Sequence, residues 1–144
     1  MKSKVLLIVG IAINALIWVN SLLPGYLSSS QSGLIVNLIY PIFENFISLN
    51  TFSVIIRKLA HFTQFMILAI VFVNYYKSIN KNKFYLITLI HGLMVAIIDE
   101  SIQLFVPGRS GLITDVLIDF SGVITGLLIV YIITIIKLKH INNN

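Results

Sequence analysis

The stretch that decides the fold of this chain is Asp99-Glu100-Ser101-Ile102-Gln103-Leu104-Phe105-Val106-Pro107-Gly108-Arg109. It joins two long apolar runs, and two further carboxylates follow it, at Asp115 and Asp119. The whole chain contains five acidic residues, and four of them lie between positions 99 and 119. A charged side chain between apolar runs costs free energy unless an opposite charge pairs with it, so such residues are retained for pairing or for a function. This junction therefore marks either tight packing or a functional site.

The composition is that of a membrane protein. Of the 144 residues, 58% are hydrophobic and 10% are charged, whereas soluble domains carry about 25% charged residues. The length fits one domain, residues 1–144, built as a single helical bundle. The chain has no cysteine, which excludes disulfides, thiolate metal sites and cysteine nucleophiles. The net charge of +5 does not indicate nucleic-acid binding, because the lysines are scattered at the ends of the apolar runs.

Four apolar runs are long enough to cross a bilayer, which takes roughly 20 residues; they cover residues 5–23, 59–76, 84–105 and 113–136. Four spans place seven lysines on one side of the membrane, namely Lys2, Lys4, Lys77, Lys81, Lys83, Lys137 and Lys139. Positively charged loops stay in the cytoplasm, so residues 24–58 and 106–112 are expected outside. The sequence therefore predicts an all-α membrane protein, a four-transmembrane-helix bundle with both termini inside.

The first outer segment contains a further predicted helix. Residues 25–33 are polar and have the composition of a loop, whereas residues 34–49 carry apolar side chains close to helical spacing. Pro41 is expected to start or kink a helix there. A fifth span would place the lysines at 77–83 outside, so we predict an outer-face interfacial or re-entrant helix between spans one and two.

The predicted topology gathers the rare polar residues of three spans at the outer face. We call this set the outer polar cluster, and its members are Arg57, Lys58, His61, Asp99, Glu100, Gln103, Arg109, Asp115 and Asp119. At 1.5 Å per residue, His61, Asp99 and Asp119 each lie roughly 6–12 Å below the outer rim. Members from one span are mostly three or four residues apart and therefore share a helix face. Below them, Gly122-x-x-x-Gly126 allows a neighbouring helix to approach closely.

Two interpretations of the outer polar cluster follow. Its bases and carboxylates roughly balance, so the cluster is either a set of buried ion pairs that locks the bundle or a site, open to the outer face, for a polar or charged ligand. The number of groups favours the site, because hydrophobic packing or a single ion pair would lock a small bundle at lower cost.

The same residues resemble the VanZ-like membrane protein family. The resemblance rests on three motifs in order: Arg57-Lys58-Leu59-Ala60-His61-Phe62, Asp99-Glu100-x-x-Gln103-Leu104-Phe105-Val106-Pro107-Gly108-Arg109 and Asp115-x-x-x-Asp119-x-x-Gly122-x-x-x-Gly126. The chain departs from the family at Gln64-Phe65, where members often have Glu-Tyr, and at Ile102, where members often have His. The resemblance implies a small multi-pass protein of the bacterial cell membrane and a role of the glycopeptide-resistance type, since the family's namesake is associated with resistance to teicoplanin. It does not name a reaction.

The first functional hypothesis is a binding protein for an anionic or amphiphilic envelope ligand. Arg57, Lys58 and Arg109 would hold a phosphate or carboxylate, the arginines through their planar forks, with His61 and Gln103 as further ligand-binding residues. Membrane lipids, a lipid-linked cell-wall precursor and a lipoglycopeptide are the partners that this chemistry suits.

The second hypothesis is a membrane-embedded hydrolase or transferase acting on a lipid-linked phosphate at the outer leaflet. Its catalytic residues would be His61, Asp99, Glu100, Asp115 and Asp119, either as acid and base or as ligands of a divalent metal that activates water. No motif of a known hydrolase or nucleotide-binding enzyme accompanies them. A third hypothesis, ion transport, lacks support because the inner half of the spans carries few polar groups.

Overall fold

The computed structural model describes residues 2–142, and within that range it contains helices and no strand. The helices are α1 (Lys2–Ser21), α2 (Gly25–Ile39), the 3-10 helix η1 (Tyr40–Ile42), α3 (Leu49–Ser78), α4 (Phe84–Gln103) and α5 (Ile113–Asn142). Among the described residues, α1, α3, α4 and α5 are long and apolar enough to cross a membrane. The predicted all-α fold with four membrane-spanning helices is confirmed.

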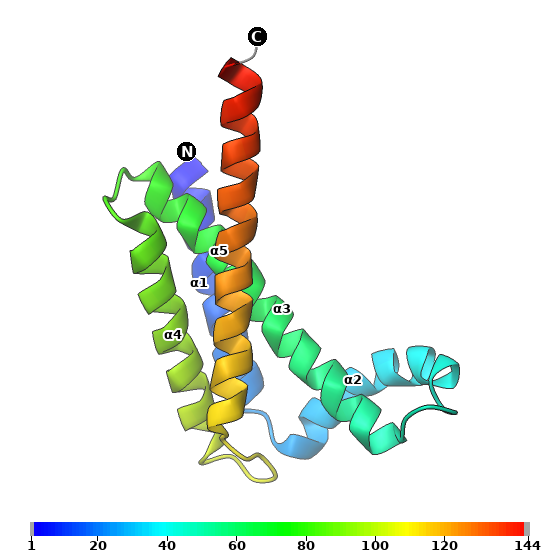
Figure 1. The fold of residues 1–144 in the computed structure, drawn as a ribbon. Helices are drawn as coiled ribbons and strands as arrows, with labels where there is room; N and C mark the ends of the chain where they lie inside the picture. Colours follow the sequence, from blue (N-terminus) through cyan, green and yellow to red (C-terminus); the bar gives the residue numbers. More distant parts are fainter. Residues whose placement is uncertain (1, 143–144) are drawn as a thin grey trace.

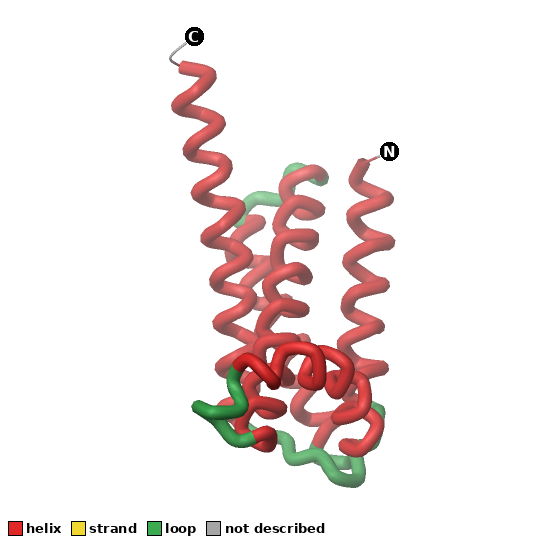
Figure 2. The backbone as a smooth tube through the Cα atoms, turned by 90° about the vertical axis from the view of Figure 1, so that its right-hand side faces the viewer, coloured by secondary structure: helices red, strands yellow, loops and turns green. Residues whose placement is uncertain are grey.

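The four long helices form one bundle, in which α3 packs against α1, α4 and α5. Figure 1 shows the two described ends of the chain at one end of this bundle, where α5 extends beyond its neighbours. Helix α2 and η1 lie at the opposite end, where they project sideways from the bundle in Figure 1 and toward the viewer in Figure 2. The α4–α5 loop lies at that same end. One end of the bundle therefore carries the termini, and the other carries α2, η1, the α4–α5 loop and the outer polar cluster.

The helix ends differ from the predicted spans, most clearly at the start of α3. The sequence places the second span at 59–76, whereas α3 runs over Leu49–Ser78. Its extra turns carry hydroxyl and amide side chains, which lower the mean hydropathy of this part of the sequence. The helix nevertheless begins there because Ser48 caps it, accepting a hydrogen bond from the backbone N–H of Thr51. The other spans shift less: α1 ends at Ser21 rather than at residue 23, α4 ends at Gln103 rather than at 105, and α5 continues to Asn142 rather than 136.

The outer segment is helical where a polar loop was predicted, so the predicted division into a loop at 25–33 and a helix at 34–49 is wrong. Helix α2 begins at Gly25, directly after Pro24, whose carbonyl accepts the first amide hydrogen bonds from Leu27 and Ser28. It ends at Ile39, because Pro41 lacks the N–H that would continue an α-helix and the chain turns into η1. Large apolar side chains of this segment point outward, Leu34 and Leu38 among them, which suits a helix lying at a membrane surface.

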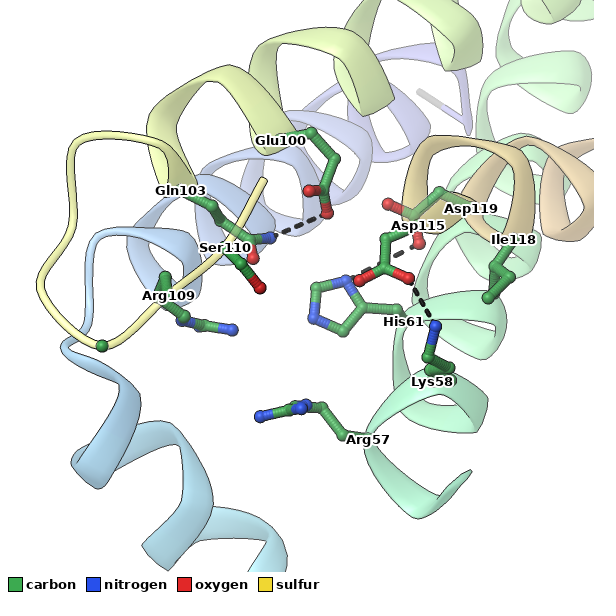
Figure 3. Close-up of a pocket in the computed structure, with 11 residues that line it drawn as sticks. Arg57, Lys58, His61, Glu100, Gln103, Arg109, Ser110, Asp115, Ile118 and Asp119 are labelled. Carbon is green, nitrogen blue, oxygen red and sulfur yellow. Dashed lines mark hydrogen bonds and ion pairs between the residues drawn. The ribbon is translucent and has the colours of Figure 1, made fainter. Parts of the chain in front are cut away.

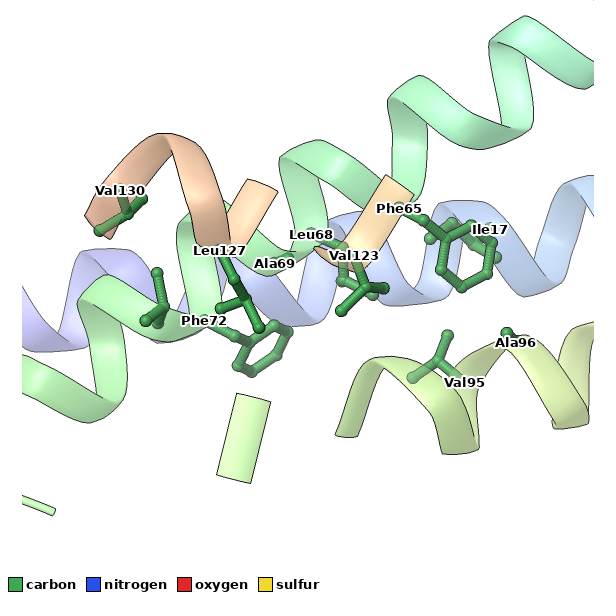
Figure 4. Packing of buried hydrophobic residues seen from close by; sticks show 11 residues of the cluster. Ile17, Phe65, Leu68, Ala69, Phe72, Val95, Ala96, Val123, Leu127 and Val130 are labelled. Atoms are coloured by element: carbon green, nitrogen blue, oxygen red, sulfur yellow. The ribbon is translucent and has the colours of Figure 1, made fainter. Parts of the chain in front are cut away.

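A buried apolar core holds the long helices together between the two ends of the bundle (Figure 4). All four contribute to it: α1 supplies Ile17, α3 supplies Phe65, Leu68, Ala69, Phe72 and Val73, α4 supplies Val95 and Ala96, and α5 supplies Val123, Leu127 and Val130. The predicted close approach at the glycine pair is confirmed. A Cβ on Gly122 would lie 2.3 Å from the carbonyl oxygen of Phe62, and one on Gly126 would lie 2.5 Å from that of Met66. The backbones of α3 and α5 are therefore in contact just below the outer polar cluster.

The orientation in the membrane stays a prediction, and the absence of cysteine from the chain makes it easy to test. Single-cysteine variants Asn45→Cys, in the exposed turn before α3, and Lys81→Cys, in the exposed α3–α4 turn, report on opposite ends of the bundle. Because lysine-rich loops remain in the cytoplasm, a membrane-impermeant maleimide should label the Asn45→Cys variant in intact cells. It should label the Lys81→Cys variant only after the cells are permeabilised. The reverse pattern would show that the outer polar cluster faces the cytoplasm.

Candidate functional site

The structure brings members of the outer polar cluster from α3, α4, α5 and the α4–α5 loop around one small cavity (Figure 3). The cavity has a volume of about 90 Å³ and is lined mainly by polar side chains. Its lining includes eight of the nine predicted residues: Arg57, Lys58, His61, Glu100, Gln103, Arg109, Asp115 and Asp119. The ninth, Asp99, is fully buried beside His61. The sequence places His61 near the outer end of a span, but α3 begins at Leu49, so His61 lies about three turns into its helix.

One pair of the cluster is a straightforward ion pair. The Nζ atom of Lys58 lies 2.6 Å from Oδ1 of Asp115, and both side chains are partly exposed. This pair joins α3 to the first turn of α5, where a carboxylate also meets the positive end of the helix dipole. Lys58 and Asp115 therefore neutralise each other at the rim of the cavity. This fits the ion-pair interpretation of these two residues.

Glu100 joins the end of α4 to the start of α5. Its Oε1 accepts a hydrogen bond from Nε2 of Gln103 at 3.1 Å, and its Oε2 accepts one from the backbone N–H of Leu112 at 2.9 Å. The carbonyl of Leu112 in turn accepts the amides of Asp115 and Val116, which begin α5. Both carboxylate oxygens of Glu100 therefore accept hydrogen bonds that position the chain, whereas the sequence predicts a catalytic role for this residue.

Asp99 is held from two sides. The hydroxyl of Ser21, at the end of α1, donates a hydrogen bond to Oδ1 of Asp99, and Nε2 of Gln103 donates one to Oδ2 at 3.0 Å. Both Ser21 and Asp99 are fully buried. Ser21 was not among the predicted site residues, because a serine near a span end carries no pattern that names its partner. Its sequence signals are its place at the last turn of the first apolar run and the stretch Asn20-Ser21-Leu22-Leu23-Pro24-Gly25, which resembles the N-terminal part of the VanZ-like family.

His61 lies between two buried carboxylates. Its Nδ1 atom is 3.6 Å from Oδ1 of Asp119 and 3.9 Å from Oδ2 of Asp99. Both distances exceed those of a hydrogen bond, about 2.7–3.2 Å. Neither oxygen of Asp119 accepts a hydrogen bond from any described residue, although the side chain is 1% exposed. Within the described part of the chain, His61, Asp99 and Asp119 are the group of side chains whose spacing could hold a metal ion.

A tight turn aims Arg109 at the end of α1. Val106-Pro107-Gly108-Arg109 has proline at its second position and Gly108, with φ +73°, at its third, and the Arg109 N–H bonds to the Val106 carbonyl. The guanidinium donates from Nη2 to the carbonyl of Asn20 at 2.7 Å and from Nε to that of Leu23 at 3.3 Å. Arg109 thus caps the carboxyl end of α1, a use that the sequence did not reveal.

Arg57 faces Arg109 across the cavity (Figure 3). No carboxylate among the described residues lies within ion-pair distance of either guanidinium, since the ion pairs of the cluster join Lys58 to Asp115 and His61 to the two aspartates. Burial, followed by the repulsion of Arg57, lowers the pKa of Arg109 below its usual range. Two cationic groups therefore approach each other without a protein anion between them.

A second cavity adjoins the first on the side of α1 and α2. It measures about 190 Å³ and is lined by both polar and apolar groups, among them Ser28, Ser32, Ile35 and Ile56. Arg57, His61 and Arg109 line both cavities. These three side chains therefore stand between a small polar chamber and a larger, more apolar one.

Comparison with models of protein families finds a match over most of the chain. A family model described as VanZ/LLP1 matches residues 6–134, a range that includes every member of the outer polar cluster. No curated protein and no solved structure matches the chain.

Proposed function

The chain belongs to the VanZ/LLP1 family, and from this premise we propose that it is a multi-pass bacterial membrane protein that binds the anionic head group of an amphiphilic envelope ligand. The single observation that carries the proposal is the pair of guanidinium groups of Arg57 and Arg109, which line one cavity without a carboxylate partner among the described residues. Both residues are partly buried, and like charges held near each other away from bulk water repel unless an anion joins them.

The donors of the two arginines suit phosphate or carboxylate. A guanidinium carries five N–H donors in a planar fork that matches these anions. Backbone carbonyls take two of the five on Arg109, and no described residue accepts a hydrogen bond from Arg57. Arg57 is therefore the principal anion-binding residue, and Arg109 is a second one that also holds α1. The sequence-based hypothesis assigned Arg57, Lys58 and Arg109 to the ligand without this division.

The size of the cavities limits the bound group. The polar cavity, about 90 Å³, exceeds the roughly 10–15 Å³ needed by one water but is well below the ~300 Å³ of sites that enclose a drug-sized ligand. It suits a head group, with the rest of the ligand in the adjoining 190 Å³ cavity or in the surrounding lipid. A lipid-linked cell-wall precursor, a phospholipid or the acidic end of a lipoglycopeptide would fit. Binding of a cell-wall precursor or of a lipoglycopeptide would connect the cavity to glycopeptide resistance of the teicoplanin type.

The binding experiment uses purified full-length protein in nanodiscs and a polyprenyl monophosphate, with the polyprenol that lacks the phosphate as the matched ligand. The phosphate should bind at least about tenfold tighter than the alcohol, and Arg57→Gln should weaken phosphate binding about 10–100-fold, because a hydrogen bond to a charged group contributes about 1.5–3 kcal/mol. Lys81→Gln, in the α3–α4 turn at the other end of the bundle, should bind like wild type. Equal affinity for the phosphate and the alcohol would overturn the proposal, as would an Arg57→Gln variant that binds normally.

A second candidate function is hydrolysis or transfer of a lipid-linked phosphate. It is favoured by His61 and Asp119, which line the same cavity as the arginines and could activate water beside a bound phosphate. Release of inorganic phosphate from the polyprenyl monophosphate, lost in an Asp119→Asn variant, would distinguish this candidate from simple binding.

A further inference from the structure

We propose that His61, Asp99 and Asp119 form a binding site for one divalent transition-metal cation, for which Zn²⁺ and Mn²⁺ have the fitting ligand preferences. The site would use Nδ1 of His61 and one oxygen from each aspartate, atoms that all lie within 4.8 Å of one another. This inference goes beyond the anion-binding function, since it concerns different atoms and is tested without an anion.

The spacing of the three groups fits a cation better than it fits direct contact. Ligand atoms bound to one Zn²⁺ at about 2.0–2.2 Å, in tetrahedral directions, lie roughly 3.3–3.6 Å apart. The Nδ1 atom of His61 is 3.6 Å from Asp119 Oδ1 and 3.9 Å from Asp99 Oδ2. A histidine held by a direct hydrogen bond would approach one of these oxygens to about 3 Å. The three ligand atoms instead lie within 4.8 Å of one another, a spacing that a small bound ion would shorten slightly.

Asp119 supplies the observation that points to a ligand. Its side chain is 1% exposed, yet neither carboxylate oxygen accepts a hydrogen bond from a described residue. Buried carboxylates are normally paired or bound to metal, because an unsatisfied buried charge is very costly. Two cations of the cluster are engaged elsewhere: Lys58 pairs with Asp115 at 2.6 Å, and Arg109 donates to the carbonyls of α1. Among the described residues, His61 is the cation within ion-pair distance of Asp119, at 3.6 Å. A divalent cation would neutralise Asp99 and Asp119 together.

The surroundings of Asp99 resemble the outer shell of a metal site. Ser21 donates a hydrogen bond to one of its oxygens and Gln103 donates one to the other, so the carboxylate is fixed in orientation before any ion binds. Such second-shell partners are a regular feature of protein metal sites. His61 and Asp119 also line the polar cavity, so a fourth position would be open to water or ligand, as in sites with three protein ligands.

The metals follow from the donors. An imidazole nitrogen favours Zn²⁺ and its neighbours, whereas carboxylate oxygens also suit Mn²⁺ and Mg²⁺. One nitrogen with two carboxylates at a compact spacing therefore points to Zn²⁺ or Mn²⁺. Ca²⁺ fits poorly, because it takes six to eight oxygen ligands.

The test is metal binding by full-length protein in nanodiscs, stripped with a chelator and then titrated separately with Zn²⁺ and Mn²⁺. Bound metal is measured by mass spectrometry after desalting. Wild type should hold one ion per chain, and Asp119→Asn should bind more than about 100-fold more weakly, because even outer-shell partners change metal affinity by about 10–100-fold. Asp115→Asn is the matched control: it removes an aspartate one turn away on the same helix, outside the three-residue group, and should keep the metal.

Three further readouts make the result decisive. If Asp119→Asn fails to fold, His61→Gln serves in its place, and the visible absorption of bound Co²⁺ in wild type reports a site with nitrogen and oxygen ligands. Arg57→Gln should keep the metal while it loses the anion, so the failure of one proposal is distinguishable from failure of the other. The proposal is overturned if wild type retains no stoichiometric Zn²⁺ or Mn²⁺. It is equally overturned if Asp119→Asn and Asp115→Asn bind the ion alike.

Discussion

Gly122→Ala should lower the free energy of unfolding by about 3 kcal/mol, at the upper end of the ~1–3 kcal/mol typical of an overpacked core. The added Cβ would lie 2.3 Å from the carbonyl oxygen of Phe62 and 3.3 Å from the amide nitrogen of Met66. These are backbone atoms of α3, which cannot move aside like the end of a flexible side chain. The helices would have to separate, so the buried contacts around Val123 would loosen as well.

Unfolding in mixed micelles with a rising fraction of sodium dodecyl sulfate measures this loss, and the fluorescence of Trp18, the single tryptophan, reports it. Gly33→Ala is the matched control, because a Cβ there meets no atom within 4 Å. Since alanine favours a helix over glycine by about 1 kcal/mol, Gly33→Ala should leave stability unchanged or raise it. Similar losses in the two variants would show that the helix contact at Gly122 is not the cause.

The same substitution should also damage the site. Gly122 lies one turn after Asp119 on α5, and Phe62 directly follows His61 on α3. Separation of the helices at Gly122 therefore moves Asp119 away from His61. Metal binding and anion binding should both fall in Gly122→Ala. In contrast, Arg57→Gln should weaken only anion binding. The close contact between α3 and α5 thus links the fold to the site.

The general fold could be predicted from the sequence because the apolar runs are long and the charges are few. Bilayer length and lysine placement predict spans, and spacing of three or four residues predicts which polar groups share a face. Those two rules were sufficient to bring His61, Asp99 and Asp119 together. The start of α3 was missed because the charged pair Arg57-Lys58 ends the apolar run, whereas the helix itself continues back to its cap at Ser48.

The partners of the site residues could not be predicted, because they lie far away in the sequence. Arg109 reaches the carbonyls of Asn20 and Leu23, and Asp99 accepts the hydroxyl of Ser21. Each contact joins the end of α1 to the α4–α5 region, and no local pattern encodes it. Helix α2 was missed for a related reason: its serine-rich composition resembles a loop, and tertiary contact with α3 overrides that preference.

Glu100→Ala should lower the free energy of unfolding by about 3 kcal/mol, because the backbone N–H of Leu112 and the amide of Gln103 would both lose a charged acceptor, each such bond contributing about 1.5–3 kcal/mol. Glu100→Gln keeps an oxygen for Leu112 and should lose less than half as much. Unfolding in mixed micelles measures both.

The pair of variants also separates positioning from catalysis. As a general acid or base, Glu100 could not be replaced by glutamine, and any phosphate-releasing activity would vanish in Glu100→Gln while stability stayed high. As the residue that fixes the start of α5, Glu100 should instead give variants whose metal and anion binding fall in proportion to their stability, the alanine variant most. Both of its oxygens already accept hydrogen bonds from the chain, which favours the second outcome. A Glu100→Gln variant that is stable but releases no phosphate would instead support a catalytic role for Glu100.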